Sequence, residues 1–326
     1  MSKSGRSGTY CARRDDRLGV HSLDHVGLIV PDLAVAQAFF ESFGLAVAGQ
    51  PDGLDIRALG DEHVWLTITK GPTKRLGHVS FGAFNDDIDA LGQRLARAGI
   101  LSDGFGNGNN VGLRFRDPLG MLVEIKAADK VMPDVKALPT IRSCPAGERG
   151  AAMRDDTTPV RPRRMAHALF FTPDIAASIA FYRDMLGLRV SDFPGPVAFL
   201  HGPHGSDHHL IAFAQSSEGI GYHHSAWDVG SLDEVGLGSA QMAAAGYGRG
   251  WGMGRHVLGS NYFHYVRDPW GSYSEYSYDI DFIPAEQDWQ AGYPSPENSL
   301  FLWGPDVPTD FVTNFERPEL AGESAA

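Results

Sequence analysis

An internal repeat constrains the fold of this chain more than any other feature of its sequence. The segment LDHVGLIVPD at residues 23–32 recurs as MAHALFFTPD at residues 165–174. Each segment has the continuous apolar character of a buried strand and ends at Pro-Asp, where the aspartate suits the N-cap of a helix. The repeat therefore predicts that both halves of the chain start with a strand followed by a helix.

Apolar spacing and glycine positions support these two helices. Apolar side chains recur at intervals of three and four over residues 33–40, and the pattern stops at Gly44. The same spacing covers residues 175–182 and stops at Gly187. A glycine after the last helical turn is typical of the C′ position, so we expect two amphipathic helices of similar length.

A second unit is also duplicated. GHVSF at residues 77–81 precedes an expected helix near 86–98, and HHSAW at residues 223–227 precedes one near 232–245. Each helix leads to a glycine-rich segment that we interpret as a loop, at residues 104–108 and 250–254. An Arg-Asp-Pro-x-Gly motif follows in both halves and predicts a tight turn between two strands, with a glutamate seven residues after the aspartate.

The four units predict an α+β fold of two domains, each made of two paired βαβββ modules. Five prolines between the halves disfavour helix and central strand, so we assign this stretch to a linker. The expected organisation is a flexible N-terminal tail (1–19), an N-terminal domain (20–129), the linker (130–162), a C-terminal domain (163–280) and a C-terminal tail (281–326). We expect the tail to pack on the body through residues 302–305 and to be disordered from residue 317 onward.

Composition limits the function classes. The net charge of -12 disfavours nucleic acid and anionic membranes as partners. The sequence shows neither a run of 18 apolar residues nor a signal peptide, so we expect no membrane association. Cys11 and Cys144 fall in the expected tail and linker, which favours a reducing cytoplasm over a disulfide framework.

The repeated motifs resemble the vicinal oxygen chelate (glyoxalase-like) superfamily over about residues 20–310. Each half carries a histidine at the start of each unit and a glutamate on its last expected strand. Within the superfamily, the chain is similar to the type I extradiol dioxygenases, such as catechol and dihydroxybiphenyl dioxygenases. The sharpest match comprises Gly254-Arg-His256, Tyr265, Asp268-Pro269 and Glu275. The resemblance implies extradiol (meta) cleavage of a catecholic diol with O₂, in aromatic catabolism, to a hydroxymuconic semialdehyde-type product.

The resemblance also implies the metal ligands His167, His224 and Glu275, placed in the C-terminal domain. Two histidines and one carboxylate occupy three positions of an octahedral Fe(II) ion and leave three for a diol and O₂. We expect Fe(II), with Mn(II) as an alternative. His223 and His224 are adjacent on an expected strand, so their side chains should face opposite ways, with His223 at the surface or packed.

Other roles follow from the same resemblance. His209 fits a general acid/base, because an imidazole exchanges protons near neutral pH. His256 and Tyr265 are expected to hydrogen-bond the substrate oxygens. The remaining expected substrate contacts are Leu169, Phe199, Trp227 and Arg255.

The N-terminal half repeats the ligand pattern with His25, His78 and Glu124. Both halves could therefore bind a metal. Arg114, however, stands where the C-terminal half has Tyr265, and its charge would repel a nearby dication. We expect this half to be non-catalytic, with core or vestigial histidines.

Alternatives remain open at this point. A glyoxalase- or isomerase-like metalloenzyme of the same fold would typically show a fourth protein ligand, and a non-catalytic binding protein would need no metal ligands. We interpret His201, His204 and His208 as solvated loop residues, since their spacing matches no zinc pattern. We also expect a cytoplasmic homo-oligomer whose small-molecule partners are the catechol and O₂.

Overall fold

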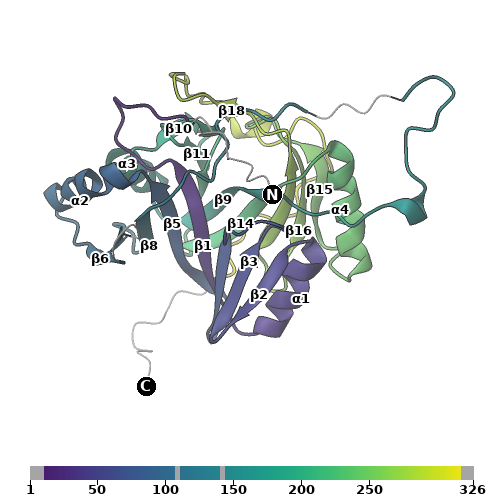
Figure 1. Cartoon of the computed structure of the whole chain (residues 1–326), viewed down its shortest axis with the longest axis horizontal. Coiled ribbons are helices and arrows are strands. Elements are labelled where there is room, and N and C mark those ends of the chain that lie inside the picture. Colours follow the sequence, from purple (N-terminus) through teal and green to yellow (C-terminus); the bar gives the residue numbers. More distant parts are fainter. Residues whose placement is uncertain (1–10, 107–110, 140–143, 317–326) are drawn as a thin grey trace, which may run out of the picture.

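The computed structural model describes residues 11–106, 111–139 and 144–316. Four consecutive βαβββ units make up its body (Figure 1). The first comprises β1 (Ser22–Val30), α1 (Leu33–Phe43), β2 (Ala46–Gln50), β3 (Gly53–Arg57) and β4 (Leu66–Lys70). The second comprises β5 (Arg75–Ala83), η1 (Asn85–Asp87), α2 (Ile88–Arg97), β6 (Asp103–Phe105), β7 (Gly112–Arg116) and β8 (Leu122–Ala127).

The C-terminal half repeats this order. The third unit comprises β9 (Arg164–Thr172), α3 (Ile175–Leu186), β10 (Arg189–Asp192), β11 (Val197–His201), β12 (Ser206–Asp207) and β13 (Ile211–Gln215). The fourth comprises β14 (Gly221–Asp228), α4 (Leu232–Ala244), β15 (Gly250–Arg255), β16 (Tyr262–Arg267) and β17 (Tyr273–Tyr278). Two short 3₁₀ turns, η2 (Arg154–Asp156) and η3 (Pro296–Asn298), and the strand β18 (Phe282–Ile283) lie outside these units.

Each half forms one eight-stranded mixed sheet. The strand orders are β2-β3-β4-β1-β5-β8-β7-β6 and β10-β11-β13-β9-β14-β17-β16-β15. In both sheets the first strands of the two units pair antiparallel at the centre, and the last strand of each unit runs parallel to its own first strand. The predicted α+β fold of paired βαβββ units is therefore confirmed.

The helix boundaries follow the local signals in the sequence. Asp32 accepts hydrogen bonds from the first turn of α1, and Asp174 does the same for α3. Gly44 and Gly187 end these helices with φ of 101° and 77°, in the left-handed region that glycine adopts without a Cβ clash. The prediction of glycine-rich loops was wrong for residues 250–254, which form β15, and for 104–105, which lie in β6; residues 107–108 fall outside the described ranges.

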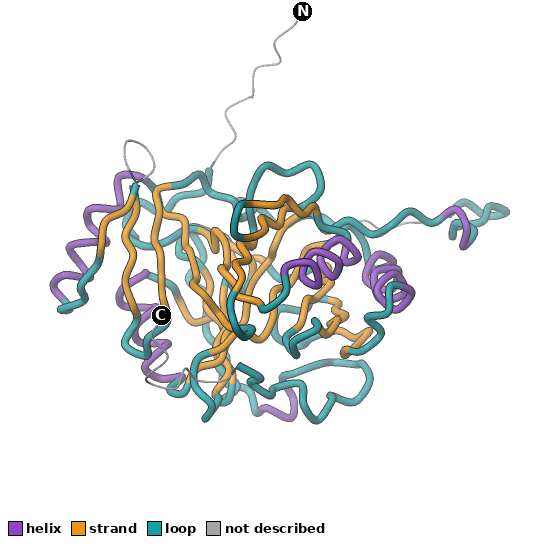
Figure 2. The backbone as a smooth tube through the Cα atoms, turned by 90° about the horizontal axis from the view of Figure 1, so that it is seen from below, coloured by secondary structure: helices purple, strands orange, loops and turns teal. Residues whose placement is uncertain are grey.

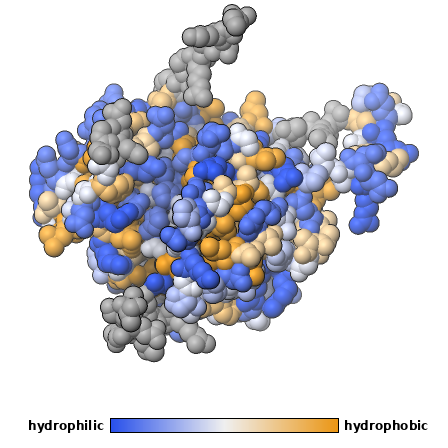
Figure 3. Space-filling view, turned by 60° about the horizontal axis from the view of Figure 1, so that its bottom comes forward, coloured by the Kyte–Doolittle hydropathy of each residue, from blue (hydrophilic) through white to orange (hydrophobic). Residues whose placement is uncertain are grey.

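The two halves pack as one body around a continuous core. Helix α1 contacts α4, and α2 contacts α3, so helices of different halves lie against each other (Figure 1). The ring of Tyr276 on β17 stacks on Phe43 of α1 with centroids 3.9 Å apart, and its hydroxyl donates to the Phe43 carbonyl. Hydrophilic and apolar areas alternate on the face drawn in Figure 3.

The segment between the sheets contains η2 and, in its described part, no strand. Its η2 end projects away from the body in two perpendicular views (Figures 1 and 2). Because the first sheet ends at Ala127 and the second begins at Arg164, we propose the domain boundaries on either side of this segment.

The described part of the N-terminal tail packs on the body of the protein. Ala12 is buried, and its N–H donates to the Asp134 carboxylate at 2.8 Å. Arg14 pairs with Asp288 of the C-terminal tail at 2.9 Å. This hydrogen bond and this ion pair join segments far apart in sequence, which local composition does not reveal.

The C-terminal tail packs on the second half. Backbone hydrogen bonds join Arg255 to Leu302 and Trp303, and Phe311 is buried. These contacts confirm the expected packing of residues 302–305, although the Trp303 side chain stays 43% exposed. The expected disorder from residue 317 onward lies outside the described residues.

The histidine-rich loop is buried, so the prediction of solvated histidines was wrong. His201, His204 and His208 are at most 2% exposed. Segments distant in sequence pack on this loop: β18 of the C-terminal tail pairs with β12 inside it. His204 contacts the Gly19 carbonyl and the Phe84 ring of the N-terminal half. In the part of the chain that the structure describes, no helix is long and apolar enough to cross a membrane.

Candidate active site

Three adjacent strands at the centre of the second sheet carry the predicted metal ligands. His167 lies on β9, His224 on β14 and Glu275 on β17, and one ligand atom of each lies within 4.8 Å of the others. The Nε2 atoms of both histidines are 3.5 Å from the Glu275 Oε2. The structure thus brings together the ligand set that the resemblance implied.

These side chains fit a divalent cation. Glu275 is fully buried, and its Oε2 and the His224 Nε2 have no hydrogen-bond partner. Leaving such polar atoms buried and unpaired is unfavourable, whereas a cation would satisfy both. Burial lowers the pKa of His224 well below its usual value, so its imidazole is neutral and able to coordinate.

The neighbouring His223 sets the orientation of His224. Its Nε2 donates to the Phe311 carbonyl at 2.8 Å, so its Nδ1 accepts from the His224 Nδ1 at 2.6 Å. The His224 Nε2 is thereby left with its lone pair toward Glu275. His223 is packed, which was one of the two expected outcomes. The expectation that the His223 and His224 side chains face opposite ways was wrong, because a register shift between Tyr222 and His224 breaks the alternation of the strand.

Asn261 holds the carboxylate ligand and was missed from the sequence. Its side-chain amide donates to the Glu275 Oε1 at 2.9 Å and to the Ser277 hydroxyl at 3.0 Å. Oε2 is therefore the oxygen that faces the two histidines. The asparagine lies just before β16, at a position that no motif marks.

A chain of three side chains orients His209. The His208 Nε2 donates to the Asp192 carboxylate at 2.7 Å, and the Nδ1 atoms of His208 and His209 are 3.0 Å apart. In this arrangement the His209 Nδ1–H donates to the His208 Nδ1, which leaves the His209 Nε2 as an acceptor. Burial, and then the neighbouring His167, lower the pKa of His209 well below its usual value. Sequence reasoning did not find the roles of Asp192 and His208.

His256 and Tyr265 form a hydrogen-bonded pair beside the ligands. The His256 Nδ1 donates to the Leu300 carbonyl at 2.6 Å, so its Nε2 accepts from the Tyr265 hydroxyl at 3.0 Å. Burial, and then the charge of Glu275, raise the pKa of Tyr265 well above its usual value. The tyrosine therefore remains a neutral phenol that can donate.

An apolar cavity of about 240 Å³ opens onto this cluster. His167, His224 and His209 line it, together with His256 and Tyr265. Most other lining residues are apolar, including Leu169, Phe199, Leu258, Leu300 and Phe311. Of the described residues that line it, none is a lysine or an arginine.

Two of the four predicted substrate contacts lie elsewhere. Leu169 and Phe199 line the cavity, as expected. Trp227 is fully buried in the main core, and its Nε1 donates to the Ser225 hydroxyl. Arg255 donates to the Ser260 carbonyl and lies over the Tyr262 ring. Both predictions were wrong because nearness to a motif in sequence does not fix the direction of a side chain.

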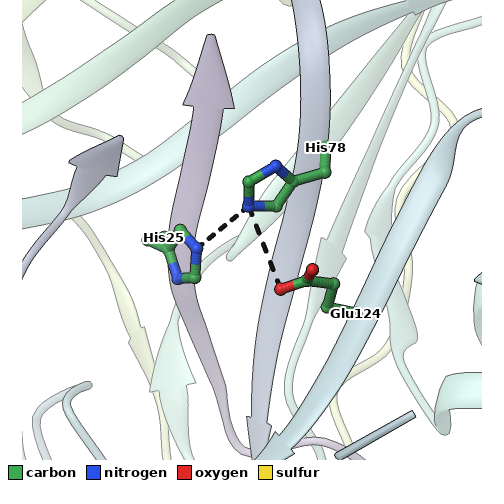
Figure 4. Close-up of side chains that lie close together, drawn as sticks. All are labelled: His25, His78 and Glu124. Atoms are coloured by element: carbon green, nitrogen blue, oxygen red, sulfur yellow. Dashed lines mark hydrogen bonds and ion pairs between the residues drawn. The ribbon is translucent and has the colours of Figure 1, made fainter. Parts of the chain in front are cut away.

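The N-terminal half brings together His25, His78 and Glu124 on β1, β5 and β8, with ligand atoms within 4.8 Å of one another (Figure 4). The expectation of core histidines is not met, because both rings are only partly buried. Arg114 donates to the Glu124 Oε1 at 2.8 and 2.5 Å.

Comparisons with known proteins agree with this geometry. Residues 22–125 and 164–276 match the Glyoxalase/Bleomycin resistance protein/Dioxygenase superfamily. The chain is 50% identical over 315 residues to metapyrocatechase 2 of Cupriavidus necator, covering 96% of this chain and 97% of that protein. The chain therefore belongs to this superfamily, and within it to the extradiol ring-cleaving dioxygenases.

Solved structures show the same architecture. The Mn(II)-bound glyoxalase from Novosphingobium aromaticivorans has a TM-score of 0.70 and 25% identity, over 92% of this chain and 99% of that one. A halotolerant catechol dioxygenase has a TM-score of 0.72 and 18% identity, over 91% and 98% of the two chains, which shows the fold alone. The family recognised from the sequence motifs is thus confirmed.

Proposed function

We propose that this protein cleaves catechols with apolar ring substituents in the extradiol (meta) manner, at an Fe(II) ion held by His167, His224 and Glu275. Both atoms of O₂ enter the product, a hydroxymuconic semialdehyde-type compound, so no further reductant is consumed. The observation that carries the proposal is the buried ligand cluster with unpaired Nε2 and Oε2 atoms at the base of an apolar cavity.

The metal, when bound, would hold the diol and O₂ side by side and let electron density pass from one to the other. Fe(II) is the finer part of the proposal, because the similar glyoxalase of known structure contains Mn(II). Two imidazoles and one carboxylate suit either ion. The choice between them is therefore a matter of measurement: apoprotein loaded with each metal should turn over faster with Fe(II).

His209 is the group we assign to proton transfer. Its Nδ1 is engaged with His208, so Nε2 is the ring nitrogen left for a substrate in the cavity that His209 lines. A neutral imidazole there can accept a proton from a diol hydroxyl and return it to the reacting oxygen. Asp192 acts as a positioning residue, because it fixes the proton of His208 on Nε2.

Tyr265 and His256 are assigned to the substrate oxygens. The Tyr265 hydroxyl and the His256 Nε2 already share one hydrogen bond, and both side chains line the cavity. A diol oxygen entering between them could accept from the phenol. The Leu300 carbonyl holds the His256 ring during this exchange.

The cavity lining defines the substrate class. Apolar side chains such as Phe199 and Leu258 favour alkyl or aryl substituents through the hydrophobic effect. A carboxylated ring would bury its charge there without a basic partner among the described lining residues, which is costly. Alkylcatechols should therefore have a higher kcat/KM than dihydroxybenzoates or dihydroxyphenylacetates.

A single experiment tests the proposed function. Apoprotein is loaded anaerobically with Fe(II), mixed with 3-methylcatechol or catechol, and exposed to air while O₂ uptake and visible absorbance are recorded. We expect one O₂ consumed per diol and a yellow product. Loaded protein that binds the metal but consumes no O₂ with either diol would contradict the proposal.

A glyoxalase-like reaction is the second candidate, because a structurally similar glyoxalase has 25% identity over most of the chain. Against it, the metal-ligand group found in the described part of the C-terminal half has three protein ligands, not four. Isomerisation of the methylglyoxal–glutathione hemithioacetal, followed at 240 nm, separates the two reactions. The non-catalytic binding protein would show neither reaction.

Two further features remain proposals. We propose a homo-oligomer, which size-exclusion chromatography with light scattering will test. We also propose a cytoplasmic location, consistent with two exposed free cysteines in the chain. Fractionation of the producing cells measures it directly.

A further inference from the structure

We propose that His25, His78 and Glu124 form a second divalent-metal site, in the N-terminal half, which takes no part in ring cleavage. This site would take a transition-metal dication of the kind that imidazole and carboxylate ligands bind, such as Co²⁺, Mn²⁺ or Fe²⁺. Figure 4 shows both imidazoles and the carboxylate pointing toward one another from three neighbouring strands.

The interatomic distances fit a shared ion. The Nε2 atoms of His25 and His78 are 3.0 Å apart. Two nitrogen ligands at about 2.1 Å and at right angles would lie about 3.0 Å from each other. The Glu124 Oε2 is 3.9 Å from the His78 Nε2, so a small rotation of the carboxylate would complete the set.

Outer contacts present the ligand atoms in the form that a metal requires. The Asp24 carboxylate lies 2.6 Å from the His25 Nδ1, which fixes the ring proton there and leaves Nε2 with its lone pair. The Arg114 guanidinium donates a hydrogen bond to the Glu124 Oε1, so Oε2 is the oxygen directed at the histidines. In the C-terminal half, Asn261 likewise donates to the Glu275 Oε1 and leaves Oε2 facing the two histidines.

The backbone also makes room for this cluster. Gly27 lies opposite His78 in the β1–β5 register, and a Cβ at Gly27 would come within 2.1 Å of the His78 Nδ1. The equivalent pair in the second sheet is Leu169 and His224. The glycine thus permits an imidazole position that any larger residue would block.

Arg114 makes this site weaker than the other and unsuited to the diol. Its guanidinium lies next to the same carboxylate and repels a dication, whereas Asn261 in the other half is neutral. It also stands opposite Glu124 in the strand pairing, where Tyr265 stands opposite Glu275. At the position of the Tyr265 hydroxyl, which we assign to the substrate oxygens, this site therefore has the guanidinium of Arg114.

The test is a titration of the metal-free chain with Co²⁺, followed by visible absorption and calorimetry. In the double variant His224→Ala, Glu275→Ala, which lacks the C-terminal site, we expect one Co²⁺ to bind. Adding Glu124→Gln should abolish that binding, and adding Arg114→Gln should tighten it by roughly tenfold or more, because a like charge is removed. Thermal melting of each variant checks that it is folded.

The full-length chain with its C-terminal site intact provides an independent measurement. Wild-type protein should bind two Co²⁺ ions of different affinity, and the single variant Glu124→Gln should bind one. A folded double variant His224→Ala, Glu275→Ala that binds no Co²⁺ would overturn the proposal. Co²⁺ binding by this double variant that survives the addition of Glu124→Gln would overturn it as well. Neither outcome would bear on ring cleavage, so failure here is distinguishable from failure of the proposed function.

Discussion

Replacing His209 by phenylalanine separates a catalytic role from a structural one. The ring is buried, and its Nδ1 makes one hydrogen bond, to the His208 Nδ1 at 3.0 Å. Phenylalanine preserves the ring shape but leaves the His208 nitrogen unpaired, which costs about 1–3 kcal/mol of folding free energy. Losing a general acid/base lowers the rate about 10²–10⁴-fold, or about 2.7–5.4 kcal/mol in activation free energy.

Stopped-flow mixing of the iron-loaded variant with O₂ and a slow substrate such as 4-nitrocatechol measures the rate, and thermal melting measures the stability. We expect His209→Phe to keep its metal and its substrate affinity while single turnover slows at least a hundredfold. His208 cannot serve as the control, because it contacts His209 directly. His204 can, since it is equally buried and contacts the Gly19 carbonyl.

The matched variant His204→Phe should lower stability and leave the single-turnover rate unchanged. An unchanged single-turnover rate in His209→Phe would refute the assignment of His209. A loss of metal in that variant would also refute it, because the role would then lie in supporting the ligands.

Four other outcomes follow from the same structure. Glu275→Ala should lose both metal and turnover in elemental and O₂-uptake analysis, while Glu124→Gln should keep kcat within a few-fold. Asp192→Asn should lower kcat about tenfold without changing KM, because it alters the orientation of a proton-transfer chain. Burial lowers the pKa of His201 to about 3 and of His204 to about 4. Because the unfolded pKa is near 6.5, their stability contribution is present above that value and is lost as pH falls, by about 2 kcal/mol each at pH 5. Urea denaturation at pH 7 and pH 5 measures the loss, and equal midpoints would contradict it.

Local signals predicted the parts of the fold that depend on neighbouring residues in sequence. Helices α1 and α3 begin after Asp32 and Asp174 and end at glycine, as capping chemistry requires. The resemblance carried by the repeated motifs then implied His167, His224 and Glu275 as metal ligands, and the structure brings the three together.

Long-range contacts explain what the sequence could not provide. The loop containing His208 has the composition of a solvated segment, yet β18, more than 70 residues downstream, pairs with β12 inside it. Asp192 at the end of β10 contacts His208, sixteen residues further along the chain, and no motif couples the two. Trp227 shares its strand with His224, but its indole points into the core. In each case the direction of a side chain depends on a partner distant in sequence.

The two halves differ less in their metal ligands than in what surrounds them. His63 precedes His78 by fifteen residues, as His209 precedes His224, but its Nε2 bonds to the Asp24 carbonyl and its ring packs on Trp65 at 4.4 Å. The His209 ring instead lies 4.0 Å from the ligand His167 and lines the cavity. A duplicated sheet thus reproduces three ligand positions through strand register alone. Proton transfer and substrate binding need groups from loops and the C-terminal tail, such as the Leu300 carbonyl that holds His256. These groups gather at the second sheet, which is why we place ring cleavage there and metal binding alone in the first.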